Sequence, residues 1–222
     1  MEMNIEIPIV PPGATDILPK MATNHEEDIR PGKTVLVIGS GGREHAIVDA
    51  LSRSARVQKI YACPGNPGMA RHATCVGISA TDVPALVEFV KEKNIDLTVV
   101  GPEASLAAGI ADALKAENRR VFGPTKAAAR IESSKEFAKE IMEKYGVPTG
   151  YKSFDRYEDA KAYAESLPLP TVIKYDGLAA GKGVVVATTR EEADAALRDM
   201  LLDSAFGQGR VLIEEFLDGP EF

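Results

Sequence analysis

The segment "TVLVIGSGGREH", residues 34–45, sets the fold class of the first part of the chain. Its β-branched run ends at Gly39 and passes through a glycine-rich turn into a helix expected to begin near Arg43. Three more strand-like runs follow, separated by helical stretches: "KIYAC" (59–63), "DLTVVG" (96–101) and "RVFG" (120–123). Four strands joined by three helical crossovers predict an α/β region with a doubly wound parallel sheet.

The helical stretches of this region carry the expected apolar spacing. One helix should follow Pro84, and another should begin near Ser105. In the latter, one face collects Leu106, Ile110, Ala113 and Leu114. We expect that face to belong to the core.

A second region of different architecture begins after a boundary near residues 124–132. Its first helix is expected to be capped by Ser133 with Glu136 and to end near Gly146 and Pro148. The buried stripe of that helix should consist of Phe137, Ile141, Met142 and Tyr145. Strands are then expected in 150–154, 170–175, 183–187 and 210–216, with helices in 155–165 and after Thr189. Because strand follows strand across a glycine loop, we expect antiparallel pairing in an α+β unit.

Composition excludes several classes of function. A net charge of −7 over 222 residues argues against a nucleic-acid partner. No apolar run approaches the roughly 18 residues of a membrane span, and the first 20 residues lack the layout of a secretory signal, so a cytoplasmic protein is expected. The two cysteines, Cys63 and Cys75, indicate reduced thiols, and the three histidines show no metal-binding spacing. Residues 1–32, broken by prolines and charges, are expected to form a flexible extension or a processed leader.

The glycine turn of residues 39–42 is a candidate anion site. A helix that starts directly after a parallel strand presents free N–H groups at the edge where such sheets bind ligands. A dinucleotide fingerprint would require its third glycine where Glu44 stands, so a single phosphate is the better ligand. Arg43 could add a charged contact, and Glu44 or His45 could meet hydroxyls or an amine, although an exposed helix start has the same composition. Glu103, after the strand 96–101, is a further polar candidate at this edge.

A second glycine loop lies in "VIKYDGLAAGKGVVVA", residues 172–187. It is one residue too short for a P-loop and leads into a valine strand instead of a helix. We therefore expect a hairpin lid whose backbone N–H groups close over phosphates. The lysines that could supply charge are Lys135, Lys174 and Lys182, although a lone lysine in an apolar strand is more often merely paired. In "VLIEEFLDGPEF", residues 211–222, the backbone around Glu215–Leu217 could read an adenine edge, while Glu221 holds ribose hydroxyls.

Taken in order, these motifs resemble one family. "VIGSGGREHAI", "PGNPG", "VGPEASLAAGI", "FGPTKAAARIESSKEFAKEIM", "VIKYDGLAAGKGVVVA" and "VLIEEFLDGPEF" are similar to the phosphoribosylamine–glycine ligases (glycinamide ribonucleotide synthetases), which are purine-biosynthetic ATP-grasp enzymes. The resemblance covers residues 34–222. It implies ATP-dependent formation of glycyl phosphate, followed by attack of the 5-phosphoribosylamine amine to give glycinamide ribonucleotide, ADP and phosphate.

The resemblance also assigns domains and site residues. It implies an N-terminal substrate-binding (pre-ATP-grasp) domain in 33–130, the first helix of the ATP-grasp core in 131–150, and the lid subdomain and hinge in 151–222. The implied catalytic residues are Lys135 and Lys174. The implied ATP-binding residues are Lys135, Lys174, Gly177, Gly181, Lys182, Gly183, Glu214, Glu215, Phe216, Leu217 and Glu221. The implied substrate-binding residues are Gly41, Gly42, Arg43, Glu44 and Glu103.

Length separates this chain from the family pattern. The resemblance implies a chain about twice as long, with the ligands for Mg²⁺ or Mn²⁺ beyond residue 222 and none here. We therefore expect an incomplete ATP-grasp fold with exposed apolar surface and no turnover by these residues alone. Three alternatives stay open: another ATP-grasp ligase or carboxylase, a non-catalytic nucleotide-binding module, and a fragment of a product fused to further purine-pathway domains.

Overall fold

The computed structural model describes residues 32–147, 150–179, 181–203 and 205–219. The expected extension in residues 1–32 therefore lies outside the described residues, except for Gly32. Pro148 and Glu221 also lie outside them.

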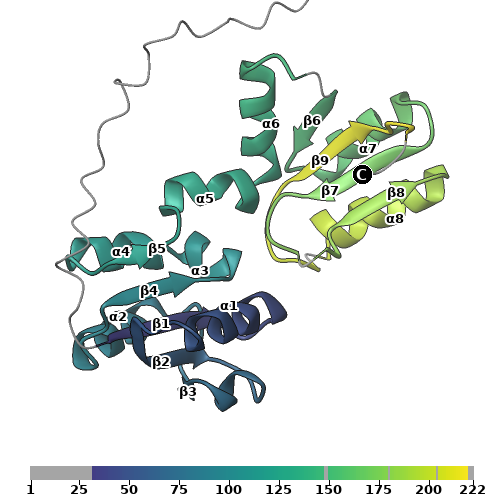
Figure 1. The fold of residues 1–222 in the computed structure, drawn as a ribbon. Coiled ribbons are helices and arrows are strands. Elements are labelled where there is room, and N and C mark those ends of the chain that lie inside the picture. The colour runs from purple at the N-terminus through teal and green to yellow at the C-terminus, as the bar shows by residue number, and fades with distance from the viewer. Residues whose placement is uncertain (1–31, 148–149, 180, 204, 220–222) are drawn as a thin grey trace, which may run out of the picture. The chain divides into compact units, whose positions relative to one another are not determined.

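The first region is built on a five-stranded parallel sheet, as the alternation of strands and helices predicts (Figure 1). Its strands are β1 (Lys33–Gly39), β2 (Val57–Pro64), β3 (Thr74–Cys75), β4 (Leu97–Val100) and β5 (Val121–Phe122), in the order β3-β2-β1-β4-β5. The central strand β1 is buried on both faces from Val35 to Ile38. Such a continuous apolar run is typical of a parallel strand covered on both sides.

The edge strand β3 was not predicted. It pairs with only two residues of β2, Tyr61 and Ala62. Its two residues, Thr74 and Cys75, are both exposed and show no apolar alternation. A strand this short leaves no periodic signal in the sequence.

The helices of this region are α1 (Gly42–Ser52), α2 (Val83–Glu92), α3 (Glu103–Ala108) and α4 (Ile110–Ala116), with a 3₁₀ turn, η2 (Met69–Arg71). The expectation of one helix from Ser105 was wrong, because Gly109 adopts φ +98° and separates α3 from α4. A left-handed residue ends a helix, and glycine adopts that conformation without steric cost. Three of the four residues of the predicted apolar face are correct, since Ile110 and Leu114 lie buried in the core and Leu106 packs against it, whereas Ala113 is only partly buried and lies outside that core cluster.

Two short helices, α5 (Lys126–Ser133) and α6 (Lys135–Lys144), connect the two sheets in sequence. α5 was not predicted, and the predicted cap at Ser133 was wrong. Ser133 is the last residue of α5, and Ser134 caps α6 by accepting a hydrogen bond from the Phe137 N–H. Either of two adjacent serines could cap this helix, and in the structure Ser134 does so.

The predicted buried stripe of α6 was also wrong for this chain. No residue of α6 is buried, Met142 is exposed, and Tyr145, which follows the helix, is 71% exposed. Nothing in the described part of the chain covers that face completely. This agrees with the expectation that apolar surface stays exposed.

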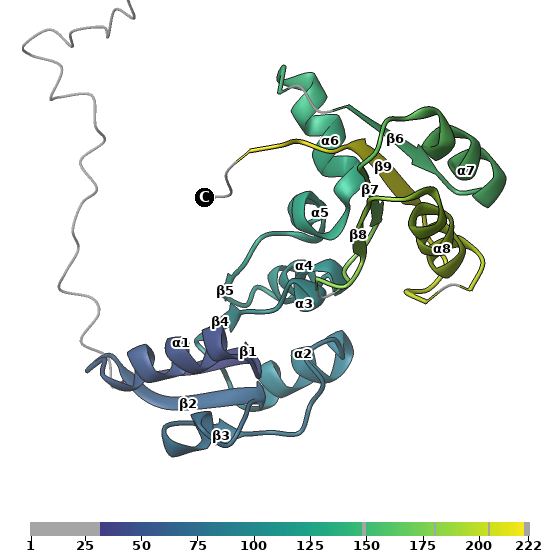
Figure 2. The same ribbon diagram turned by 90° about the vertical axis from the view of Figure 1, so that its right-hand side faces the viewer.

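The second sheet is antiparallel, with the order β6-β9-β7-β8 (Figure 2). Its strands are β6 (Tyr151–Phe154), β7 (Thr171–Tyr175), β8 (Val184–Ala187) and β9 (Val211–Glu215). Helices α7 (Tyr157–Ser166) and α8 (Arg190–Leu201) pack against one face through a core that contains Ile173, Tyr175, Val211 and Ile213. Because side chains alternate along a strand, Lys174 and Glu214 point to the opposite face.

Both α7 and α8 are held by local polar contacts. As predicted, Thr189 and Glu192 form a capping box at the start of α8. Asp194 of α8 accepts hydrogen bonds from the Tyr157 hydroxyl and from Arg198, and it pairs with Lys161 of α7 at 2.7 Å. Tyr157 and Lys161, both on α7, thereby tie the two helices together.

Candidate functional site

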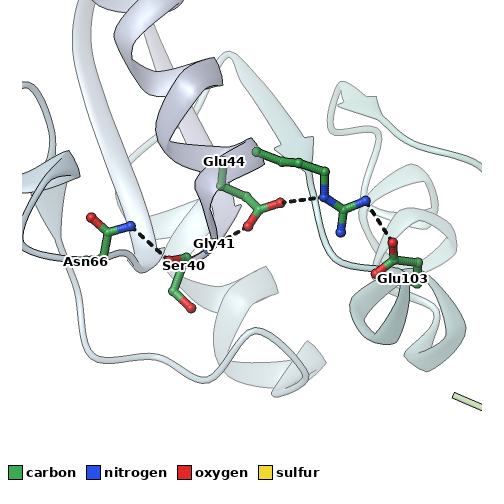
Figure 3. A network of polar contacts seen from close by, with 6 residues as sticks. Ser40, Gly41, Glu44, Asn66 and Glu103 are labelled. Atoms are coloured by element: carbon green, nitrogen blue, oxygen red, sulfur yellow. Dashed lines mark hydrogen bonds and ion pairs between the residues drawn. The ribbon is translucent and has the colours of Figure 1, made fainter. Parts of the chain in front are cut away.

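The glycine turn after β1 shapes the start of α1. Gly41 is the N-cap of this helix, and its N–H donates to Oε2 of Glu44 at 2.7 Å. Gly39 adopts φ +126°, a conformation that favours glycine. Figure 3 shows Glu44 directed back toward Gly41. One carboxylate oxygen of Glu44 therefore satisfies a free N–H at the beginning of its own helix.

Glu44 is buried, with 3% of its surface exposed, because three glycines leave room for it. A Cβ at Gly101 would lie 2.3 Å from Oε1 of Glu44, and a Cβ at Gly39 would lie 2.5 Å from Cγ. At Gly41 the corresponding distance, to Oε2, is 2.9 Å. Oε1 is buried and has no hydrogen-bond partner among the described residues. The predicted site residue Glu44 thus fixes the turn through Oε2 and keeps Oε1 without a hydrogen bond.

Arg43 and Glu103 join two loop ends of the first sheet. The Arg43 Nη1 donates to Oε1 of Glu103 at 2.8 Å, and the Arg43 Nε lies 3.9 Å from Oε1 of Glu44 (Figure 3). The hydrogen bond from Arg43 lowers the pKa of the Glu103 carboxyl. Arg43 itself is 67% exposed at its side chain. The predicted substrate-binding residues Gly41, Gly42, Arg43, Glu44 and Glu103 therefore form one cluster.

Asn66 belongs to the same cluster and was not singled out from the sequence. Its Nδ2 donates to the Ser40 carbonyl at 2.8 Å, and its Oδ1 accepts from the Met69 N–H at 3.0 Å. Figure 3 shows Asn66 beside Ser40. An asparagine inside "PGNPG" was the available signal, because Asn side chains commonly bond neighbouring loop backbone.

The second cluster joins α6 to the glycine loop between β7 and β8. Lys135, in the first turn of α6, donates through Nζ to the Gly177 carbonyl at 2.9 Å. Partial burial lowers the pKa of Lys135; the nearby positive charge of Lys174 acts in the same direction, and Asp176 opposes it. The hydrogen bond to Gly177 thus joins one of the two predicted catalytic lysines to the glycine loop.

Asp176 is a further link that the sequence did not reveal. Its Oδ2 accepts from the Ser134 hydroxyl and its Oδ1 from the Glu136 N–H, each at 3.2 Å. A carboxylate at a helix N-terminus is stabilised by the free N–H groups and by the helix dipole. Asp176 thereby fixes the first residues of the glycine loop to the start of α6.

Glu214 of β9 is shared by two lysines. Its Oε2 lies 2.9 Å from Nζ of Lys174 on β7 and 3.0 Å from Nζ of Lys139 on α6. Glu214 is 7% exposed, and its Oε1 has no hydrogen-bond partner among the described residues. Lys139 lies four residues after Lys135 on α6 and was not predicted as a site residue.

The glycine loop has the predicted hairpin form, since β7 and β8 pair antiparallel on its two sides. Gly177 and Gly181 adopt φ +148° and +78°, and the Gly183 carbonyl accepts from the Tyr175 N–H at 2.8 Å. Lys182 is exposed at the tip. A cavity of about 710 Å³ borders this cluster, with Lys135, Gly177, Gly181 and Gly183 among its lining residues.

The remaining predicted nucleotide-binding residues follow β9. Phe216 and Leu217 are exposed at 42% and 73%, and Glu215 at the end of β9 is also exposed. The described part of the chain contains no group of three or more His, Cys, Asp or Glu residues that could hold a metal ion. In the same part, no helix has the length and apolarity needed to cross a bilayer.

Comparison with known proteins places both regions in one family. Residues 33–132 match "Phosphoribosylglycinamide synthetase, N domain", and residues 133–222 match "Phosphoribosylglycinamide synthetase, ATP-grasp (A) domain". Over 190 residues the chain is 56% identical to the phosphoribosylamine–glycine ligase of Halalkalibacterium halodurans, covering 84% of this chain and 44% of that protein. Identity to the Escherichia coli O157:H7 ligase is 49% over 192 residues, covering 84% and 45%.

Solved structures agree with this grouping. The crystal structure of the phosphoribosylamine–glycine ligase of Thermotoga maritima aligns with a TM-score of 0.67 at 30% identity, covering 84% of this chain and 44% of that one. The biotin carboxylase domain of the Hydrogenobacter thermophilus 2-oxoglutarate carboxylase, solved with MgADP, aligns with a TM-score of 0.66 over 85% and 45%. At 20% identity, this second likeness shows the fold alone.

The chain spans less than half the length of these relatives. Within that span, the matched domains follow each other without a gap from residue 33 to residue 222. The chain belongs to the phosphoribosylglycinamide synthetase family, of which it carries the N domain and a part of the ATP-grasp domain.

Proposed function

We propose that the chain contributes the nucleotide lid and the phosphoribosylamine-binding domain to an ATP-dependent ligase that joins glycine to 5-phosphoribosylamine. The observation that carries this proposal is the meeting of Lys135, Lys174 and the glycine loop. Lys135 contacts the Gly177 carbonyl, and Lys174 lies on the same face of the sheet as Glu214. Family membership supports the choice of substrates.

In this proposal ATP is a substrate that binds between the glycine loop and the segment after β9. Lys135 and Lys174 contact its phosphates, and the N–H groups of Gly181 and Gly183 close over them, whereas the Lys182 N–H donates to the Ala179 carbonyl at 2.9 Å. Backbone groups of residues 214–217 read the adenine edge, and Glu221 binds the ribose. The buried, unpaired Oε1 of Glu214 suits a polar ligand group, because a buried acceptor without a donor is unfavourable.

The proposed reaction has two steps. A glycine carboxylate oxygen attacks the γ-phosphorus of ATP, the bond to the β–γ bridging oxygen breaks, and ADP leaves with the electron pair. The amine of 5-phosphoribosylamine then attacks the carbonyl carbon of glycyl phosphate, loses a proton and expels phosphate. Both reactants of the first step are anionic, so Lys135 and Lys174 lower its barrier by offsetting the accumulated negative charge.

The first sheet is proposed to hold the phosphoribosylamine. Glu44 already accepts from the Gly41 N–H, so the N–H of Gly42, the first residue of α1, is the backbone group proposed to meet the phosphate, because N–H groups at a helix start bind phosphate well. Arg43, which is exposed and already oriented by Glu103, supplies a cation beside it.

The test uses the product of the complete reading frame. ADP release should require glycine and phosphoribosylamine together, and bicarbonate should not replace glycine. A Lys174→Met variant should lose at least about 100-fold in kcat, since removal of one transition-state charge contact costs this much. Lys152→Met is the matched control, because Lys152 is an exposed strand lysine resting over the Tyr163 ring.

Two outcomes would contradict the proposal. ADP release that depends on bicarbonate would favour a carboxylase of the same fold. Saturable ATP binding without any product would favour a non-catalytic nucleotide-binding protein.

A further inference from the structure

Three charged side chains from three elements meet behind the glycine loop. Oε2 of Glu214 is bound by Lys174 and Lys139 at 2.9 and 3.0 Å. The Glu214 side chain is 8% exposed, that of Lys139 is 14% exposed, and that of Lys174 is 27% exposed. Lys174 is thus the more accessible of the two cations, and Lys139 is the more deeply enclosed.

The proposed function requires Lys174 to contact the phosphates of ATP, and the present inference rests on it. In the structure Lys174 pairs with Glu214, so it must weaken or leave that contact when a nucleotide binds. If Lys174 were the only cation on Glu214, its departure would leave a buried carboxylate unpaired, which carries a large free-energy penalty. A second cation on the same oxygen removes that penalty.

We propose that Lys139 is a positioning residue that keeps Glu214 paired while Lys174 moves to the phosphates. Lys139 lies one helical turn after Lys135, on the same face of α6. The start of this helix is held to the glycine loop by Asp176 and by the Lys135 contact to Gly177. Lys139 belongs to α6 and Lys174 to β7, so the contact of Lys139 with Glu214 does not depend on where the Lys174 side chain points.

The experiment separates this role from general stability by comparing two ligands. Adenosine has no phosphates and leaves Lys174 on Glu214, whereas ADP draws Lys174 away. In the product of the complete reading frame, Lys139→Met should raise the Kd for ADP by about tenfold or more while the Kd for adenosine changes less than about twofold. Lys139→Arg, which keeps the charge, should restore most of the ADP affinity.

Lys144→Met is the matched control. Lys144 lies on the same helix and is exposed, with its ammonium 5.6 Å from the centre of the Tyr145 ring. It should bind both ligands as the unmodified protein does. Urea unfolding midpoints would show whether each variant is folded before binding is measured.

The outcomes are distinct. Equal losses of ADP and adenosine affinity in Lys139→Met, or no loss of either, would overturn the role of Lys139 while the proposed function stands. If the unmodified protein binds neither ligand, the proposed function fails and the inference fails with it.

Discussion

A methyl group at Gly101 tests whether Glu44 shapes the first site. Gly101 lies at the end of β4, and its N–H donates to the Ile38 carbonyl at 3.1 Å. A Cβ there would lie 2.3 Å from Oε1 and 2.4 Å from Cγ of Glu44, closer than nonbonded atoms approach. The backbone of Gly101 is not in the left-handed region, so the clash is the main effect of Gly101→Ala.

The expected magnitude follows from two terms. Overpacking a filled space costs about 1–3 kcal/mol. If Glu44 moves away instead, its charged hydrogen bond to the Gly41 N–H is lost, which costs roughly 1.5–3 kcal/mol. Because the chain pays one cost or the other, we expect Gly101→Ala to lower the free energy of unfolding by about 1–3 kcal/mol. Gly42→Ala is the control, because no atom lies within 4 Å of its added Cβ.

Urea denaturation measures both variants, with an unchanged m value required for the comparison. The free energy of unfolding of Gly42→Ala should lie within about 1 kcal/mol of that of the unmodified chain. Any change should be an increase, because alanine favours helices more than glycine does. In the double variant Glu44→Ala/Gly101→Ala the clash disappears, so its stability should equal that of Glu44→Ala alone. A Gly101→Ala variant as stable as the unmodified chain, or additive effects in the double variant, would refute the reasoning.

Three further outcomes are expected from single groups. Hydrogen bonds, the strongest of them from Lys161, hold the pKa of the Asp194 carboxyl well below its usual value of about 4. The ionised carboxylate therefore stabilises the fold above about pH 4, and this contribution to stability is lost as the pH falls toward the lowered pKa. Acid unfolding curves of Asp194→Asn should therefore show a smaller drop in stability below pH 4, and parallel curves would contradict the assignment. Burial raises the pKa of the Cys63 thiol to about 12, so iodoacetamide at pH 8 should label Cys75 and spare Cys63 until urea unfolds the chain; peptide mass spectrometry showing equal labelling would disprove this. Gly109→Ala forces alanine to φ +98° and should cost about 1–2 kcal/mol in urea denaturation, whereas an unchanged midpoint would show that the α3–α4 junction relaxes.

The two sheets were predictable because their strands carry strong local signals. In β1, the continuous apolar run Val35–Ile38 fits a strand buried on both faces. In β7, buried Thr171, Ile173 and Tyr175 alternate with less buried residues, which fits a strand buried on one face. Antiparallel pairing followed from the valines directly after the glycine loop. These features depend on residues close in sequence, and their apolar pattern decides which face is buried.

The connections between elements were harder to predict. α5 carries small and charged residues around its single buried residue, Ala129, so its apolar stripe is narrow. Either Ser133 or Ser134 could cap the next helix on local grounds. The choice of Ser134 places its hydroxyl beside Asp176, a residue more than 40 positions away. A contact of that range cannot be recognised from local pattern.

In the candidate site, too, features set by local sequence were predictable and contacts between distant residues were not. The loop glycines and the lysines of α6, β7 and the second loop were proposed because their types suit phosphate binding, and the structure brings Lys135 and Gly177 together. Asn66 and Asp176 were missed because each meets a backbone group distant in sequence, the Ser40 carbonyl for Asn66 and the Glu136 N–H for Asp176. Nothing in the sequence indicates which backbone group a polar side chain will meet.

Under the proposed function, the position of Asp176 explains why this loop relies on lysines. A P-loop binds phosphate at the free N–H groups of the helix that follows it. Here β8 follows the loop, and the nearest helix start, that of α6, is already occupied by the Asp176 carboxylate, which accepts from the Glu136 N–H. The helix dipole therefore stabilises a protein anion, and positive charge for a bound phosphate has to come from side chains. Lys135 begins that same helix and Lys174 lies two residues before Asp176, so the contact that blocks the helix end also fixes both lysines at the mouth of the loop.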